Sequence, residues 1–451
     1  MTRDLTVGKV TPTLFKYTLP MFISVLFQQM YNLADSSIAG KFAGEDALAS
    51  IGASYPITMI FMAICTGCNI GCTVILSQCF GAKRIDNFKT GASTSIIFGI
   101  LLSIPITAVA VILSPQMLSM VKTPVEIFTD ARIYLRVYML GFGFLFLYNM
   151  INGIFNAMGD SRTPLYFLIA SSIGNVFLDV VFVAVLKMGV LGAALATLIA
   201  QGIACFGAFF VLVLRLKNLQ VPIKPPRFSF SILGTILFVA IPTALQSSFV
   251  SVGNLLIQSL INSCGKGVIA GFAAAFKLNT IFLTGIGTIS GGVSAFTAQN
   301  IGAKKFDRVQ KGLGAGILVG FSVALPIILL YTFCGSTLLT AFLEDGGSEA
   351  MTVGRTFLII TSPFYFFVSA KLICDGVLKG TKSMLLFMIS TFTDLILRVL
   401  IAYALFDSMS YSGIFAAWPV GWIIGGILSV SFYFAVISKQ KKLLSQVELK
   451  Q

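Results

Sequence analysis

Apolar stretches of about 20 residues recur from one end of the chain to the other, with only short polar breaks between them. A helix of about 20 apolar residues crosses the hydrocarbon core of a bilayer, so each stretch is long enough to span it. Of the 451 residues, 57% are apolar and 11% are charged, whereas about 25% are charged in soluble domains. The sequence therefore predicts a multi-pass membrane protein with no room for a soluble domain.

The stretches predict twelve transmembrane spans. They begin near residues 14, 50, 91, 127, 164, 189, 231, 268, 311, 350, 384 and 412. Backbone amides find no water in hydrocarbon, so each span must satisfy its own hydrogen bonds as a helix. The alternating pattern of a lipid-facing β-barrel strand is missing from these stretches. We therefore predict an all-α membrane protein.

The formal charge of +14 could indicate a nucleic-acid partner, but the distribution of the cations argues against one. Of the 31 lysines and arginines, 21 lie in alternate loops or at the two ends of the chain. Positive loops stay on the cytoplasmic side, so both termini are predicted to be cytoplasmic, in a bacterial inner membrane. The polar start of the chain, with no small-residue cleavage site after the first apolar run, predicts that this run is a retained span.

A heptapeptide is repeated at an offset of 221 residues. Gln78-Cys79-Phe80-Gly81-Ala82-Lys83-Arg84 recurs as Gln299-Asn300-Ile301-Gly302-Ala303-Lys304-Lys305. An even number of spans separates the copies, so the repeat is parallel, and it predicts two six-helix bundles related by a pseudo-two-fold axis. We expect lobes at residues 1–214 and 231–438, a basic linker at 215–230 and a cytoplasmic tail at 439–451. A central cavity between the lobes would suit alternating access, and a channel or static scaffold is the alternative.

Several ionisable residues fall inside the predicted spans, where each is costly unless it is neutralised. Asp375 follows Lys371 by one helical turn, and Asp394 precedes Arg398 by one turn, so two structural ion pairs within single helices are expected. Lys277 has no such neighbour and would pair across helices or line the cavity.

Asp35 and Asp179 differ from these residues because neither has a cation within four residues. Gln28 and Asn32 share a helical face with Asp35, and Asn175 shares one with Asp179, so both polar stripes should face protein or water. Burial disfavours a charged carboxylate, so a proton, a Na⁺ ion or a cationic substrate must supply the missing charge. Two acids satisfied by neutral neighbours and water alone are the structural alternative.

Enzymatic chemistry is not expected. The chain has no histidine, no buried glutamate and no nucleophile with an evident base. Cys65, Cys68 and Cys72 line one helical face, and they are interpreted as small packing residues, not a metal site. The segment 376–383 has the wrong spacing for a phosphate loop and follows a membrane helix, so no ATP is expected. We predict no cofactor, and no metal ion apart from Na⁺ at Asp35 and Asp179.

The sequence resembles the multidrug and toxic compound extrusion (MATE) family, and within it the bacterial DinF-type branch. The resemblance covers nearly the whole chain and depends on the twelve spans in two lobes, the repeated Gln-x-x-Gly-Ala-Lys motif, and Pro20 with Asp35 on the first span. It implies that Asp35, Asn175, Asp179 and Thr197 take up the coupling cation, and that Pro20 bends the first span. Other branches carry a buried glutamate in the C-terminal lobe, which this chain lacks, so a coupling site there is not expected unless Asp375 is unpaired.

The sequence thus predicts a monomeric antiporter that exports organic, cationic and amphipathic compounds in exchange for H⁺ or Na⁺. Its partners would be small organic substrates and the lipid bilayer. The residues expected to line the cavity or contact substrate are Gln28, Asn32, Asn152, Lys277 and Asp375. A flippase for lipid-linked precursors, on a related two-lobed fold, is the alternative.

Overall fold

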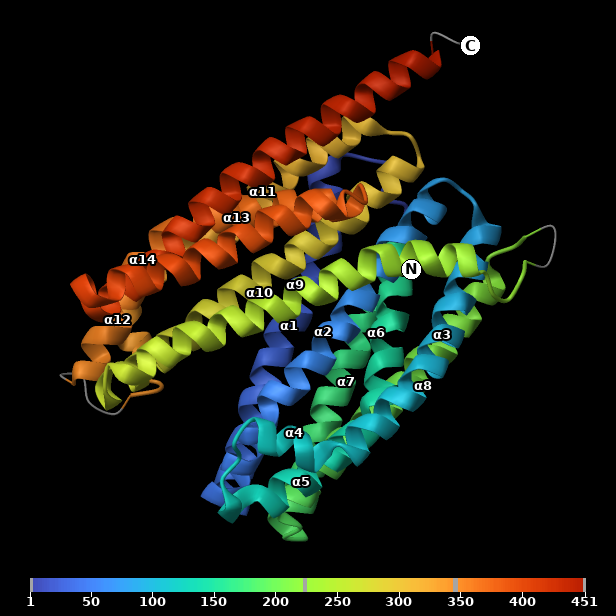
Figure 1. Ribbon diagram of the computed structural model, residues 1–451. Coiled ribbons are helices and arrows are strands. Elements are labelled where there is room, and N and C mark those ends of the chain that lie inside the picture. Colours follow the sequence, from blue (N-terminus) through green and yellow to red (C-terminus); the bar gives the residue numbers. More distant parts are fainter. Residues whose placement is uncertain (1–2, 222–224, 344–347, 449–451) are drawn as a thin grey trace. The chain divides into compact units, whose positions relative to one another are not determined.

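The computed structural model describes residues 3–221, 225–343 and 348–448, and all regular structure in these ranges is helical (Figure 1). Ten helices are long and apolar enough to cross a membrane, and a further pair, bent by 43°, passes the same test together. The apolar stretch Met384–Gln440 has 57 residues, which at about 1.5 Å per residue is nearly three bilayer cores long. Ser410, with φ of 50°, divides it into two spans. The all-α fold is confirmed, and the described residues are consistent with twelve spans.

The six spans of the first half begin within six residues of the predicted positions. They are α1 (Val10–Ile38), α2 (Glu45–Gly81), α3 (Ile85–Ile112), α4 (Ser114–Met120), α5 (Val125–Leu140), α6 (Phe142–Ala157), α7 (Arg162–Asp179) and α8 (Gly189–Asn218). Two short π-helices follow α1 and α7, at η1 (Ala39–Ala43) and η2 (Val180–Val185). The bent pair is α5 and α6, which together are long and apolar enough for one span.

The described residues of the second half are also helical. This half contains α9 (Phe230–Ser263), α10 (Lys266–Gly302), α11 (Phe306–Leu339), α12 (Glu349–Thr361), the 3₁₀ turn η3 (Ser362–Phe364), α13 (Tyr365–Gly380) and α14 (Met384–Glu448). The segment 439–448, expected to be a cytoplasmic tail, continues the helix α14.

By their internal contacts, the described residues form two compact units. Unit 1 contains residues 3–4 and 20–244, and unit 2 contains residues 5–19 and the described residues from 245 onward. This division differs from the predicted lobes, because α1 changes unit at Pro20 and α9 changes unit two residues after Pro242. A proline removes one backbone hydrogen bond and weakens the helix locally, so both changes of unit occur at or near a weakened turn.

Glycines allow the helices of unit 1 to approach closely. A Cβ atom on Gly67 would lie 2.5 Å from the Ala240 carbonyl oxygen of α9, and one on Gly71 would lie 2.7 Å from the Ile236 oxygen. These glycines are four residues apart on α2, so they form one small-residue face. The interior of unit 2 is instead filled by aromatic rings, with Phe272 of α10 and Trp418 of α14 both packed on Phe357 of α12.

Candidate functional site

The two acids predicted to couple transport lie where regular α-helix ends. Asp179 is the last residue of α7, and Asp35 lies three residues before the end of α1. The π-helices η1 and η2 continue from these ends and contact each other. A π-turn widens the helix and is often found at functional sites. The sequence contains no recognisable signal for either π-helix, so this part of the site was not predicted.

The structure brings the four predicted coupling residues together in unit 1. The Asp35 and Asp179 carboxyl groups lie within hydrogen-bonding distance of each other, and Asp179 is only 1% exposed. With its amide nitrogen facing Asp179, Asn175 donates to Asp179 Oδ2 at 2.8 Å and accepts from the Thr197 backbone nitrogen at 3.1 Å. The Thr197 hydroxyl donates to the Ala193 carbonyl oxygen at 3.1 Å.

This arrangement is not stable as two bare carboxylates. Like charges at hydrogen-bonding distance repel, so the pair must share a proton or hold a cation. Within the described part of the chain, the Oδ1 atoms of Asp35 and Asp179 are buried with no hydrogen-bond donor. Carboxylate, amide and hydroxyl oxygens are the ligands that hard cations prefer. The chemistry of the group therefore fits H⁺ or Na⁺.

Three tyrosines surround the acids and were not predicted. The Tyr31 hydroxyl hydrogen-bonds Thr197, and Tyr31 lies one helical turn before Asp35 on α1. Tyr134 and Tyr138 of α5 stack with ring centroids 6.0 Å apart, and the Tyr134 hydroxyl lies near both acids. The four-residue spacing of Tyr31 from Asp35 was a usable signal, since it puts both side chains on one helical face.

The residues expected to line a cavity are more scattered. Gln28 and Asn32 are exposed on α1, and Asn152 of α6 is partly buried, with its Oδ1 atom lacking a partner in the described chain. Lys277 of α10 is exposed, and its ammonium group lies 5.4 Å from the Phe342 ring centroid. Lys277 and Asp375 belong to unit 2, so neither is part of the acid pair's unit.

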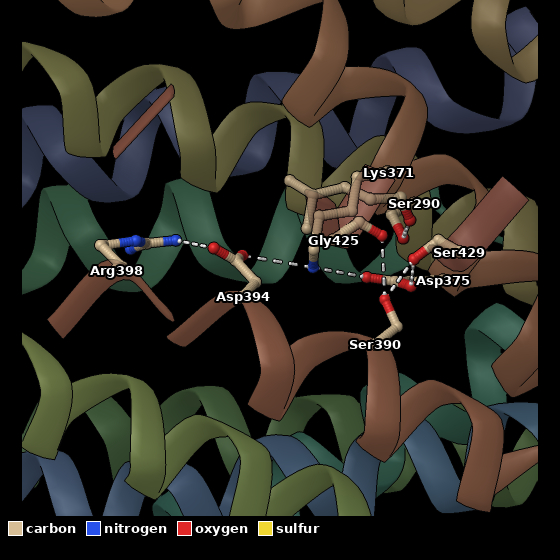
Figure 2. A network of polar contacts seen from close by, with 9 residues as sticks. Ser290, Lys371, Asp375, Ser390, Asp394, Arg398, Gly425 and Ser429 are labelled. Atoms are coloured by element: carbon tan, nitrogen blue, oxygen red, sulfur yellow. Dashed lines mark hydrogen bonds and ion pairs between the residues drawn. The ribbon is translucent and has the colours of Figure 1, made fainter. Parts of the chain in front are cut away.

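Unit 2 holds a buried charged network that we call the tetrad: Lys371, Asp375, Asp394 and Arg398 (Figure 2). Lys371 Nζ lies 3.0 Å from Asp375 Oδ2, and Arg398 Nη2 lies 2.8 Å from Asp394 Oδ1, so both predicted pairs within one helix are confirmed. Lys371 Nζ also lies 3.6 Å from Asp394 Oδ2, on a different helix. The sequence did not predict this third contact, which joins the two pairs.

The repeated motif forms a helix end in each half. Gly81 and Gly302 are the last residues of α2 and α10, and the backbone at Lys83 and Lys304 then turns with φ of 59° and 58°. In the first copy the Ala82 nitrogen donates to the Gln78 carbonyl oxygen, and in the second the Ala303 nitrogen donates to the Gln299 carbonyl oxygen. Both copies of the motif therefore end a helix in the same left-handed turn.

The second copy also binds the N-terminal segment, residues 5–8. Gln299 Oε1 accepts from the Leu5 nitrogen at 3.0 Å, Asn300 Nδ2 donates to the Leu5 oxygen at 3.3 Å, and Lys305 Nζ donates to the Thr6 oxygen at 2.9 Å. Within unit 1, Lys83 pairs with Asp4 at 2.7 Å. All three contacts from the second copy are to backbone atoms, so they depend little on the side chains of the segment.

The fold and the buried acids define a multi-pass membrane protein of the transporter class. A family model described as MatE matches residues 20–181 and 242–404, two blocks that begin at Pro20 and Pro242. The chain therefore belongs to the MatE family, whose members are transporters and not enzymes. It is a multi-pass bacterial membrane protein.

Named relatives cover most of the chain. It is 29% identical over 433 residues to the probable multidrug resistance protein YpnP of Bacillus subtilis (strain 168), covering 96% of this chain and 94% of that protein. It is 24% identical over 377 residues to the multidrug export protein MepA of Staphylococcus aureus (strain RF122 / ET3-1), covering 82% of each. A crystal structure of MATE in the straight conformation has the same fold, with a TM-score of 0.90, 21% identity, and coverage of 97% of this chain and 98% of that one.

Proposed function

We propose that this chain is an antiporter that exports organic, cationic and amphipathic compounds in exchange for H⁺ or Na⁺ bound by Asp35 and Asp179. The observation that carries the proposal is the pair of buried carboxyl groups within hydrogen-bonding distance of each other, each with one oxygen that lacks a donor in the described chain. A site that needs an added positive charge to be stable binds and releases that charge as its surroundings change.

Coupling requires that the cation and the substrate stabilise different states of the transporter. The alternating distribution of lysine and arginine supports cytoplasmic termini. Pro20 and Asp35 lie on the same span, α1. Pro20 would act as the hinge of α1, because α1 changes unit at this residue. Binding at Asp35, about four turns along the same helix, is then connected to the hinge by continuous α-helix.

Two relatives named as multidrug resistance or export proteins support organic compounds as the cargo. A cationic substrate would compete with the coupling ion for the negative charge of the acid pair, and the nearby ring faces of Tyr31, Tyr134 and Tyr138 would favour it through cation–π contacts. Direct competition at one site is the simplest way to exchange two positive species.

The test is efflux of a fluorescent organic cation from proteoliposomes under separately imposed pH and Na⁺ gradients. We expect one of the two gradients to drive export by the unaltered protein and neither to drive export by Asp35→Asn. Asp46→Asn, which changes an exposed acid at the start of α2, is the matched control and should transport normally. Gradient-driven export by Asp35→Asn at the normal rate would overturn the proposal.

A flippase for lipid-linked precursors would need free cations to bind a pyrophosphate. The buried cations Lys371 and Arg398 are instead in contact with Asp375 and Asp394, which favours the antiporter. Saturable binding of a lipid pyrophosphate to the purified protein, with no transport of organic cations, would reverse this preference.

A further inference from the structure

The tetrad places one ammonium group between two carboxylate oxygens. Lys371 Nζ contacts Asp375 Oδ2 and Asp394 Oδ2, which come from α13 and α14. The other oxygen of each carboxylate is also occupied, because Ser429 donates to Asp375 Oδ1 at 2.6 Å and Arg398 donates to Asp394 Oδ1 at 2.8 Å. Figure 2 shows the four charged residues as one continuous line of contacts. Two carboxylate oxygens therefore face one position that is filled by the lysine ammonium, and their negative charge would attract a free cation to the same position.

The backbone of α14 is shaped to accept this group. A Cβ atom on Gly421 would lie 2.5 Å from Asp394 Oδ1, and one on Gly425 would lie 2.7 Å from Lys371 Cε. Ser390 donates to the Gly425 carbonyl oxygen at 3.2 Å and shares a hydrogen bond with Ser429, so further oxygens lie beside the carboxylates. The tetrad is therefore a built site, in which two helices leave room for the charged groups.

Stability alone does not account for this site. Burying an ion pair costs much of what the pair returns, and apolar residues of similar volume are often as stable or more stable. Lys371 is 3% exposed and Asp394 is also 3% exposed, so the charges are withdrawn from water. Charged groups at bilayer depth usually have a functional role.

The chain thus contains two pairs of buried acids whose negative charge is balanced in different ways. Asp35 and Asp179 in unit 1 lie beside each other, and no lysine or arginine of the described residues contributes to their surroundings. Asp375 and Asp394 in unit 2 are bridged by a cation that is covalently part of the chain. We propose that Lys371 is a tethered counter-ion that occupies a latent monovalent-cation site in unit 2 and so leaves unit 1 as the place of ion exchange.

The inference rests on the proposed function only where it assigns ion exchange to Asp35 and Asp179. The expected effect of removing Lys371 does not depend on antiport. Without the ammonium, the net charge of the tetrad is negative and a site for a free cation opens. Lys371→Ala is therefore expected to bind Na⁺, K⁺ or NH₄⁺ where the unaltered chain has the lysine. This is a gain of binding, which loss of packing alone would not produce.

The experiment measures thermal unfolding of the purified full-length protein in choline chloride and in equal concentrations of NaCl, KCl and NH₄Cl. All variants carry Asp35→Asn, so the unit 1 site contributes equally to every variant and no transport is needed. Lys371→Ala should unfold at a lower temperature in choline, and at least one of the three small cations should restore the midpoint in a saturable way. The Asp35→Asn protein with Lys371 intact, and the same protein with Lys277→Ala, should not distinguish the salts.

A second variant controls for failure to fold. Lys371→Ala combined with Asp375→Asn leaves Asp394 balanced by Arg398, so this protein should be insensitive to the choice of cation. Where Na⁺ is a cation that restores the midpoint, binding of ²²Na⁺ at equilibrium should show about one added ion per chain in the Lys371→Ala protein and none in the combined variant. If Lys371→Ala does not fold, Lys371→Gln replaces it, since it removes the same charge with less loss of volume.

Equal unfolding midpoints in all four salts for the Lys371→Ala or Lys371→Gln protein would overturn the inference. So would cation sensitivity that persists in the combined variant. Neither outcome would bear on antiport by Asp35 and Asp179, which is tested by transport, so the two proposals can fail separately.

Discussion

With its amide nitrogen facing Asp179, Asn175 donates a 2.8 Å hydrogen bond to Asp179 Oδ2, one turn along α7. This bond occupies one carboxyl oxygen, while the other, Oδ1, is buried with no donor in the described residues. Asn175 therefore orients the Asp179 carboxyl group as well as sharing its polar surroundings.

Asn175→Ala should weaken coupling without abolishing insertion. The substitution leaves Asp179 Oδ2 without its donor, which costs about 1–3 kcal/mol, or roughly 5- to 150-fold in affinity for the coupling cation. The measurement is the dependence of export on the concentration of the driving cation in proteoliposomes. Asn175→Gln keeps the amide but moves it, so its half-saturating cation concentration should fall between those of the unaltered protein and Asn175→Ala. An unchanged half-saturating concentration for Asn175→Ala would contradict the assigned role.

Asp179→Asn should abolish gradient-driven export and leave the fold intact. Two neighbouring carboxyl groups need a shared proton or cation, whereas a carboxyl beside an amide can be satisfied by a neutral hydrogen bond. We expect the thermal unfolding midpoint to be equal to or above that of the unaltered protein, while export falls by about tenfold or more. A protein that loses stability and activity together would indicate that Asp179 is structural.

Pro20→Ala should slow transport more than it weakens substrate binding. Restoring a backbone nitrogen at this position permits a regular hydrogen bond where α1 changes unit, and this stiffens the helix. The comparison is the maximal export rate against the equilibrium affinity for a fluorescent substrate. Pro242→Ala tests the equivalent position in α9, and an effect on affinity alone for both variants would exclude a hinge.

Gly425→Ala should destabilise unit 2, whereas the neighbouring Gly426→Ala should not. A methyl group on Gly425 would lie 2.7 Å from Lys371 Cε, but one on Gly426 would find its nearest atom, the Phe367 oxygen, at 3.6 Å. Overpacking of this kind typically costs about 1–3 kcal/mol. Thermal unfolding of the two single variants makes the comparison, and equal midpoints would show that the tetrad tolerates displacement.

Cysteines placed at positions 6 and 7 of the N-terminal segment should differ in their rate of chemical labelling. Thr6 is 3% exposed and Val7 is 53% exposed. In a background without native cysteines, Thr6→Cys should react with a soluble maleimide at least about tenfold more slowly than Val7→Cys, because reaction must await local opening. Adding Gln299→Ala, which removes the acceptor of the Leu5 nitrogen, should speed the reaction at position 6 and leave position 7 unchanged.

Much of the fold could be predicted because the bilayer imposes length and hydrogen bonding on every span. Three helices begin within two residues of the predicted positions: α7 at Arg162, α8 at Gly189 and α12 at Glu349. Helix ends were harder, because α2 and α10 each run to 37 residues and so extend beyond the apolar core. Residues outside hydrocarbon carry no length constraint, so hydropathy does not mark where such a helix stops.

The site was predictable where its contacts are local along one helix. Asn175 and Asp179, Lys371 and Asp375, and Asp394 and Arg398 are each one turn apart, and all three pairs are in contact. The contact of Lys371 with Asp394 depends on how α13 packs against α14, which spacing along the chain does not determine. The approach of Asp35 to Asp179 was expected only from the family resemblance, for the same reason.

The bond between the Leu5 nitrogen and Gln299 Oε1 joins residues 294 positions apart. At about 5–20 residues per second, the ribosome finishes Leu5 roughly 15–60 s before its partner exists. Docking of the N-terminal segment is therefore a late event of biosynthesis, and it can occur only after α10 has been made. A nascent chain that stalls earlier keeps Leu5 and Thr6 accessible, so their burial marks a chain whose assembly has passed its tenth helix.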